Sequence, residues 1–165
     1  MRREGTAVWI TQAGIIAAMY AVLTIVLAPI SYGPVQFRIA EALTILPFFT
    51  TAAIPGLFIG CLIANLFGGN GLPDIVFGSL ATLAAAFISS KIKTKWLVPL
   101  PSVVINAFVV GFVLNITLGV PYWATVGWVG FGQAVTCYGL GMIFLYVLEK
   151  YKYRVFMQPY RNGKN

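Results

Sequence analysis

The sequence predicts an all-α integral membrane protein with six transmembrane helices and both termini in the cytoplasm. Hydrophobic residues make up 59% of the 165 residues and charged residues only 9%, against about 25% in an average soluble domain. Apolar runs of about 20 residues recur, as transmembrane helices require. The basic residues gather at the two ends and in one short loop, which is typical of cytoplasmic segments.

Four helices follow directly from apolar runs at 7–29, 73–90, 97–118 and 121–149. The last run is long for one crossing, so we expect that helix to tilt or to project from the bilayer. Residues 1–149 are expected to form one membrane domain, and 150–165 a basic cytoplasmic tail.

The run at 37–67 is predicted to form two short helices, at 37–49 and 52–67. A single helix of this length would measure about 45 Å, too long for a hydrocarbon core of about 30 Å. Pro47 and Pro55 flank the stretch "TTAA", and proline disfavours helix in the residue before it. A turn between the two prolines is therefore expected.

The basic residues support the same division. With two helices at 37–67, ten of the eleven Lys and Arg residues fall on one side of the membrane, and Arg38 alone lies on the other. The ten are Arg2, Arg3, Lys91, Lys93, Lys95, Lys150, Lys152, Arg154, Arg161 and Lys164. A single helix would instead separate the loop "KIKTK" from the N-terminal arginines.

This topology brings polar residues from several helices to similar depths near the outer side. They predict a shallow, outward-facing substrate site lined by aromatic and charged side chains. The candidates are Arg38, Glu41, Asn65, Asp74, Tyr122 and Trp123, with Asn106 and Gln133 deeper in their helices.

Each candidate also has a structural explanation. Arg38 and Glu41 can pair with each other three residues apart, and Asp74 can stabilise a helix start. Tyr122 and Trp123 lie where interfacial aromatic residues are common. Asn106 and Gln133 are more informative, because a buried amide in lipid needs a partner. Together the candidates suggest a ligand, although no single residue proves one.

Several classes of function are excluded by what the sequence lacks. There is no histidine, and Cys61 and Cys137 have no CxxC spacing, so neither a Cys/His metal site nor a His-based catalytic triad is expected. Both cysteines are interpreted as small core residues. No phosphate-binding loop is present in the sequence, so the chain does not hydrolyse ATP by itself. The positions of the basic residues fit membrane topology better than nucleic-acid binding, so no nucleic-acid partner is expected.

Small residues recur at four-residue spacing on three helices, a pattern that lets helices approach closely in lipid. The stripes are Ala13, Ala17 and Ala21; Gly56, Gly60, Ala64 and Gly68; and Gly78, Thr82, Ala86 and Ser90. Periodicity does not decide which stripe, if any, faces a partner protein.

The segments "QFRIAEALTILPFF" and "GLPDIVFGSLATL", within a likeness that runs from about residue 9 to 149, resemble the QueT family of proposed queuosine-precursor transporters. Members of that family are substrate-binding (S) components of energy-coupling factor (ECF) transporters. The resemblance implies a six-helix S component in a bacterial cell membrane, with no enzyme activity and no cofactor of its own. It also implies a transmembrane coupling protein and two cytoplasmic ATPases as partners, with Ala13, Ala17 and Ala21 contacting the coupling protein.

The implied substrate is a 7-deazaguanine base. A carboxylate, Glu41 or else Asp74, can accept the adjacent N–H groups of the guanine edge. Arg38 can then bind the ring carbonyl. Asn65 and Gln133 can bind other polar edges of the base. Tyr32, Tyr122 or Trp123 can stack on its flat ring. The alternative is a stand-alone secondary transporter driven by protons through Glu41 or Asp74. A membrane enzyme is not expected, because this sequence has no nucleophile beside a plausible base. A purely structural membrane protein would leave the group of polar residues without a ligand.

Overall fold

The computed structural model describes residues 3–32, 36–69 and 71–155, and in these residues it contains helices and no strands. The α-helices are α1 (Arg3–Val26), α2 (Ala28–Ser31), α3 (Ala53–Gly68), α4 (Ser79–Ser89), α5 (Leu100–Leu118), α6 (Tyr122–Ala134) and α7 (Met142–Val155). Two 3₁₀ helices, η1 (Ile39–Phe48) and η3 (Lys95–Leu97), and two π-helical segments, η2 (Asp74–Gly78) and η4 (Val135–Gly141), complete the set.

The division of the 37–67 run is confirmed, because η1 ends at Phe48 and α3 begins at Ala53. The other expected helices also appear within a few residues of their predicted bounds. Glycine ends two of them: Gly69 after α3 and Gly119 after α5 have φ angles of 74° and 68°, which only glycine adopts without cost.

In the part of the chain that the structure describes, three helical segments are long and apolar enough to cross a membrane, at 5–26, 95–118 and 122–151. The other three, at 39–48, 53–68 and 74–89, are apolar but shorter. At about 2 Å per residue, the ten residues of η1 extend only about 20 Å. The chain thus has the composition of a multi-pass membrane protein, in which some segments do not span the bilayer by length alone.

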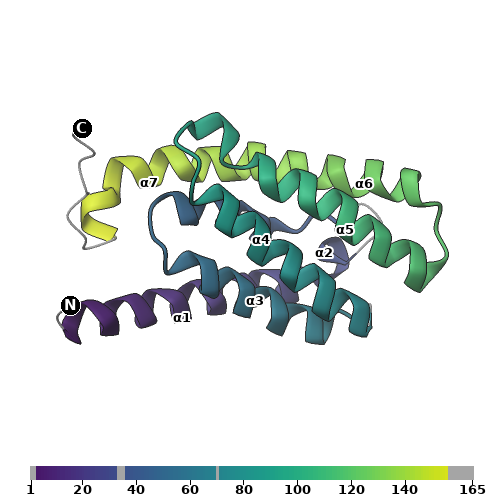
Figure 1. Cartoon of the computed structure of the whole chain (residues 1–165), viewed down its shortest axis with the longest axis horizontal. Helices are drawn as coiled ribbons and strands as arrows, with labels where there is room; N and C mark the ends of the chain where they lie inside the picture. Colours follow the sequence, from purple (N-terminus) through teal and green to yellow (C-terminus); the bar gives the residue numbers. More distant parts are fainter. Residues whose placement is uncertain (1–2, 33–35, 70, 156–165) are drawn as a thin grey trace.

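The start of α1 and the end of α7 lie at the same end of the helical bundle (Figure 1). Lys95 is joined to Glu149 of α7 by an ion pair of 2.8 Å, which places the "KIKTK" loop beside α7. The predicted basic tail begins inside α7, because that helix continues to Val155; residues 156–165 lie outside the described part of the chain.

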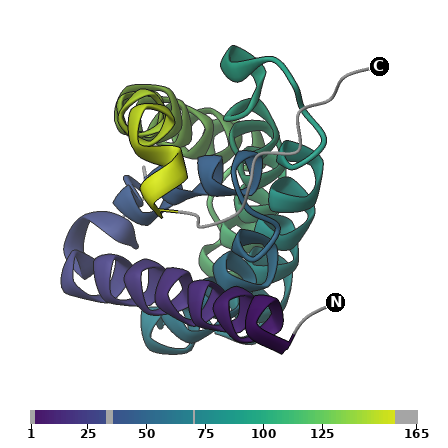
Figure 2. The ribbon, with the colours of Figure 1, turned by 90° about the vertical axis from the view of Figure 1, so that its left-hand side faces the viewer.

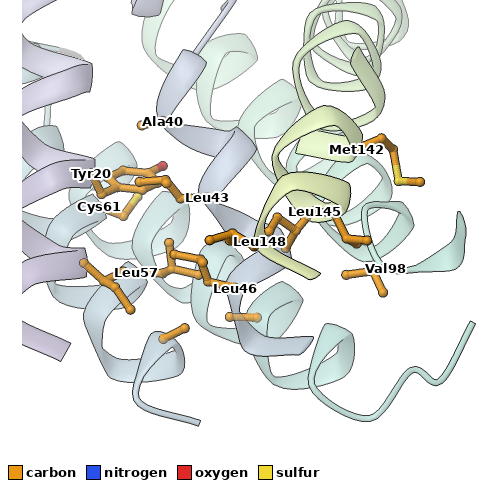
Figure 3. Packing of buried hydrophobic residues seen from close by; sticks show 14 of the residues in the cluster. Tyr20, Ala40, Leu43, Leu46, Leu57, Cys61, Val98, Met142, Leu145 and Leu148 are labelled. Carbon is orange, nitrogen blue, oxygen red and sulfur yellow. The ribbon is translucent and has the colours of Figure 1, made fainter. Parts of the chain in front are cut away.

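The 3₁₀ helix η1 is the central element of the bundle. It contacts α1, α3, α4, η4 and α7, and the view along the bundle shows it enclosed by the surrounding helices (Figure 2). The main apolar cluster forms around it, with Leu43 and Leu46 of η1 between Leu57 of α3 and Leu145 of α7 (Figure 3). Ten residues is long for a 3₁₀ helix, which rarely exceeds three or four, so this geometry depends on the neighbouring helices.

Helix α1 packs closely along α3 because glycines on α3 face the alanines of α1. A Cβ atom at Gly60 would lie 2.7 Å from the carbonyl oxygen of Ala17, and one at Gly56 would lie 2.8 Å from that of Ala13. Ala13, Ala17 and Ala21 are accordingly buried, at 6–8% exposure.

The expectation that these three alanines contact a partner protein is therefore revised. Their side chains already lie in the interface with α3, so they form no free surface here. Gly14 and Ala18, each one position further along the helix, are exposed, as are Gly5 and Ala7 near its start.

Replacing Gly60 by Ala is expected to destabilise the bundle by about 1–3 kcal/mol, because the new methyl group has backbone atoms of α1 as its neighbours. Thermal unfolding in detergent should show a lower midpoint. Gly14→Ala is the matched control: a Cβ there meets nothing within 4 Å, so its midpoint should be unchanged or slightly raised. Equal effects of the two substitutions would contradict the close packing of α1 and α3.

Candidate functional site

Glu41 lies on η1 with 1% of its surface exposed, and both of its carboxylate oxygens accept hydrogen bonds. The hydroxyl of Tyr20 on α1 donates to Oε1. The side-chain amide of Asn106 on α5 donates to Oε2 at 3.2 Å. A carboxylate removed from water is stabilised mainly by such donors. Three separate helices are thus linked through one acidic side chain.

Arg38 immediately precedes η1 and is also buried, at 3% exposure. Its Nη1 donates to the sulfur of Cys61 at 3.8 Å, and its guanidinium carbon lies 5.4 Å from the centre of the Tyr32 ring. Arg38 and Glu41 are therefore not held mainly by each other, as the simple i,i+3 pair would have required. Each side chain takes its described contacts from other helices.

Cys61 links Arg38 to the residues of α3 and α4. Its sulfur also accepts from Asn65 at 3.5 Å and from the hydroxyl of Thr82 at 3.3 Å. The amide of Asn65 donates in addition to the backbone carbonyl of Asp74 at 3.0 Å. The interpretation of Cys61 as a small core residue was thus incomplete: it is fully buried, but its neighbours are polar.

Asp74 joins this group at the start of η2 and is fully buried. It lies close enough to Arg38 for electrostatic attraction. A Cβ atom at Gly78 would lie 2.9 Å from both the Asn65 amide nitrogen and the Asp74 Oδ1. Glycine at 78 therefore leaves room for these two side chains to meet.

Gln133 approaches the group from α6 through Cys137. The thiol of Cys137 lies 3.6 Å from both the Gln133 Oε1 and the Glu41 backbone carbonyl. Thr44 lies 3.9 Å from the same sulfur. Both Gln133 and Cys137 are buried, so this contact extends the polar group to the other side of η1.

Several buried polar atoms in the group have no hydrogen-bond partner within the described residues. They are Nε and Nη2 of Arg38, Oδ1 of Asn65, Oδ1 of Asn106 and Nε2 of Gln36. Leaving such groups unpaired costs about 1–3 kcal/mol each, and more for a charged one. Both donors and acceptors are thus available for a polar molecule that binds among these side chains.

The backbone is irregular wherever it carries this group. Glu41 lies on a 3₁₀ helix, Asp74 and Gly78 on one π-helical segment and Cys137 on another. Such departures from α-helix are frequent at functional sites. Gln36 adds a φ angle of 48°, which is unfavourable for a residue with a side chain. We call the eight buried residues that meet here the polar cluster: Tyr20, Arg38, Glu41, Cys61, Asn65, Asp74, Thr82 and Asn106.

The polar cluster is more deeply buried than the shallow site that the sequence predicted. Tyr32 lies over Arg38, and its hydroxyl donates to the backbone carbonyl of Ala64 at 2.6 Å. Its ring fits against Gly68, where a Cβ atom would approach it to 2.5 Å. Tyr32 thus covers one side of the cluster at Arg38, which helix depth alone did not reveal.

Two of the predicted site residues lie apart from the polar cluster. Tyr122 and Trp123 begin α6, with ring centroids 5.1 Å from each other. Trp123 is 75% exposed, which agrees better with an interfacial aromatic residue than with a buried stacking partner.

Three members of the cluster were not recognised as site residues in the sequence. Tyr20, Cys61 and Thr82 stand in apolar helices without a nearby charge. For Tyr20 a signal did exist, since a tyrosine hydroxyl within a lipid-spanning helix needs a hydrogen-bond partner.

A comparison with known families covers the part of the chain that carries this cluster. The model of the QueT transporter family matches residues 10–150, which include η1 and the whole polar cluster. The chain belongs to the QueT transporter family. This family consists of transporters, in agreement with the prediction that the chain is not an enzyme.

A curated relative supports the same family. The queuosine precursor transporter QueT of Lactococcus lactis subsp. cremoris (strain MG1363) is 41% identical over 76 residues. This match spans 45% of the chain and 44% of the relative. No solved structure is significantly similar to the chain.

Tyr20 and Glu41 are expected to be energetically coupled. Tyr20→Phe should lower the free energy of unfolding by about 1–3 kcal/mol, because it leaves one buried carboxylate oxygen without a donor. In the background of Glu41→Leu the same change should cost much less. Thermal or denaturant unfolding of the two single variants and the double variant measures this coupling.

Tyr122→Phe provides the control for that cycle, because Tyr122 is partly exposed and lies outside the polar cluster. The effects of Tyr122→Phe and Glu41→Leu on the free energy of unfolding should be additive. Additive effects of Tyr20→Phe and Glu41→Leu would contradict the role of Tyr20 as the main support of this carboxylate.

Proposed function

We propose that the chain is the substrate-binding S component of an ECF transporter and that it captures a queuosine precursor, a 7-deazaguanine base, from outside the cell. Energy for uptake comes from two partner ATPases through a transmembrane coupling protein. The name of the curated relative, which refers to a queuosine precursor, supports the substrate class. The observation that carries the proposal is a buried carboxylate beside unpartnered guanidinium and amide atoms.

This arrangement suits a flat base with N–H groups on one edge and a carbonyl beside them. Glu41 accepts the N–H pair, as a carboxylate does in bidentate recognition. Because Tyr20 and Asn106 already donate to Glu41, the ligand has to displace at least one of them. Arg38 then donates its unpartnered Nε and Nη2 to the ring carbonyl.

Asp74 is the second carboxylate of this proposal and takes the guanine edge if Glu41 keeps its present partners. Asn65 binds a further polar edge of the ligand, and Gln133 reaches the same region from the other side of η1. Tyr32, which already lies over Arg38, is the best placed of the three predicted aromatic residues to stack on the base.

The proposed topology has six crossings with both termini in the cytoplasm of a bacterial cell. Its support is the position of the start of α1 and the end of α7 at one end of the bundle (Figure 1), together with the basic loop beside α7. Cytoplasmic segments are enriched in Lys and Arg. In this orientation Tyr32 and Arg38 lie toward the outside.

The exposed face of α1 is proposed to contact the coupling protein. Gly14 and Ala18 lie on that face at four-residue spacing, and small residues at this spacing let membrane helices approach closely. This replaces Ala13, Ala17 and Ala21, whose side chains pack against α3.

A proton-driven carrier is the second candidate, because Glu41 and Asp74 are buried acids inside a membrane protein. Uptake by whole cells separates the two. An S component loses uptake when its partner ATPases are deleted. A proton-driven carrier keeps uptake after this deletion and loses uptake when the proton gradient is collapsed.

Binding to the purified full chain is the direct test of the S component. Isothermal calorimetry should detect a 7-deazaguanine at nanomolar to low-micromolar dissociation constants without any partner protein. Glu41→Gln should weaken binding at least tenfold, about 1.4 kcal/mol, because the amide repels one of the two N–H donors.

Glu149→Gln is the matched control, since Glu149 pairs with Lys95 at the end of the bundle. This variant should bind the ligand like the unchanged protein. Guanine, riboflavin, thiamine and biotin serve as control ligands. No binding of any 7-deazaguanine would refute the substrate, and full affinity in Glu41→Gln would remove Glu41 from the site.

The contact with the coupling protein predicts a separation of binding from uptake. Ala18→Leu should leave ligand binding unchanged and reduce cellular uptake strongly, because the larger side chain keeps the partner helix away. Ala17→Leu should instead lower the unfolding midpoint, as its side chain faces α3. Normal uptake by Ala18→Leu would place the coupling surface elsewhere.

A further inference from the structure

We propose that Cys61 is a positioning residue for ligand binding: its sulfur holds the Arg38 guanidinium in the orientation in which two nitrogens of that group remain free for the ligand. This inference rests on the proposed function, in which Arg38 binds the ring carbonyl. It gives the buried thiol a task that a side chain filling space would not have.

The contacts of the Cys61 sulfur are the first observation. Nη1 of Arg38 donates to it at 3.8 Å, the amide of Asn65 at 3.5 Å and the hydroxyl of Thr82 at 3.3 Å. The thiol itself lies 3.9 Å from the carbonyl oxygen of Gly78, to which it donates. Thr82 has one hydroxyl hydrogen, which it shares between this sulfur and the same carbonyl at 3.1 Å. One buried sulfur thus joins α3 to the segment before η1, to η2 and to α4.

The pattern of partners on the Arg38 guanidinium is the second observation. Within the described residues, Nη1 donates to Cys61, whereas Nε and Nη2 are buried and have no hydrogen-bond partner. Nε and Nη2 share one edge of the planar group, and such an edge offers two parallel donors for bidentate contacts. Cys61 therefore holds the group at one nitrogen and leaves this edge for a ligand.

Holding Arg38 in this way opposes a competing arrangement. A long side chain has many rotamers, and fixing one of them costs free energy. Glu41 follows three residues later, at a spacing where opposite charges commonly pair. A guanidinium that turned to Glu41 would occupy the cation and the carboxylate that the ligand needs. The contact with Cys61 stabilises the rotamer in which both stay available.

Sulfur suits this position because of its reach. Hydrogen bonds from N–H to oxygen are about 2.7–3.2 Å long, whereas the three donors here lie 3.3–3.8 Å from the Cys61 sulfur. A serine hydroxyl at this position would keep an acceptor but could not approach all three donors at once. An alanine methyl group would accept from none. The support of Arg38 should therefore decrease from cysteine to serine to alanine.

Calorimetry on the purified full chain tests this order. The probe is 7-aminomethyl- or 7-cyano-7-deazaguanine, whichever binds the unaltered chain more tightly. We expect Cys61→Ala to weaken binding about tenfold or more, and Cys61→Ser to bind about threefold or more tightly than Cys61→Ala. Packing alone predicts no advantage of serine, because both substitutions leave a cavity and serine adds a buried hydroxyl.

A double-mutant cycle shows whether Cys61 acts through Arg38. Arg38→Lys keeps the positive charge but lacks the Nη1 atom that Cys61 holds. In that background Cys61→Ala should weaken binding less than about threefold. Cys137→Ala is the matched control, because it removes a buried thiol whose described contacts are with Thr44, Gln133 and the Glu41 backbone. Its effect on affinity should be the same with Arg38 and with Arg38→Lys.

The outcomes separate this inference from the proposed function. Full affinity in Cys61→Ala, equal losses in both Arg38 backgrounds, or tighter binding by Cys61→Ala than by Cys61→Ser would each overturn the positioning role and leave the S component standing. Cys61→Ser, the smaller change, supplies the same cycle if Cys61→Ala does not fold. Binding of neither compound by the unaltered chain would refute the proposed substrate, and the role of Cys61 with it.

Discussion

The burial of Glu41 inside an apolar bundle is the constraint on which the rest of the structure depends. A carboxylate at 1% exposure needs donors on both oxygens, and they come from α1 and α5, through Tyr20 and Asn106. The element that carries Glu41 must therefore lie between those helices. A short 3₁₀ helix in the centre of the bundle meets this requirement, and the helices around it are arranged to enclose it.

The close contact of α1 with α3 serves the same end. Gly56 and Gly60 bring the two helices together, so that Tyr20 of α1 and Cys61 of α3 lie beside each other next to η1 (Figure 3). Any larger residue at these glycines would separate the side chains that hold Glu41 and Arg38. Packing by small residues and the support of buried charges are thus two aspects of one interface.

The helices could be predicted from the sequence, because apolar runs, prolines and the distribution of Lys and Arg report on the bilayer directly. The convergence of Arg38, Glu41, Asn65, Asp74, Asn106 and Gln133 followed from that topology and from the need of buried polar groups for partners. The 3₁₀ and π geometries could not be predicted, since they arise from tertiary packing around η1. That Ala17 faces Gly60 could not be predicted either, because small residues have the same spacing on an inner and an outer helix face.

The two π-helical segments also have a meaning for the history of this chain. A π turn holds about one residue more than an α turn, because its hydrogen bonds join i to i+5 instead of i+4. Deleting one residue within 135–141 would restore a regular helix and leave the segments before and after it on nearly their present faces, because the wider turn absorbs the extra residue. Gln133 and Met142 would keep their places, and only the backbone between them, which carries Cys137, would change. One inserted residue is thus enough to reshape the part of the helix that carries Cys137 while the rest of the bundle keeps its packing.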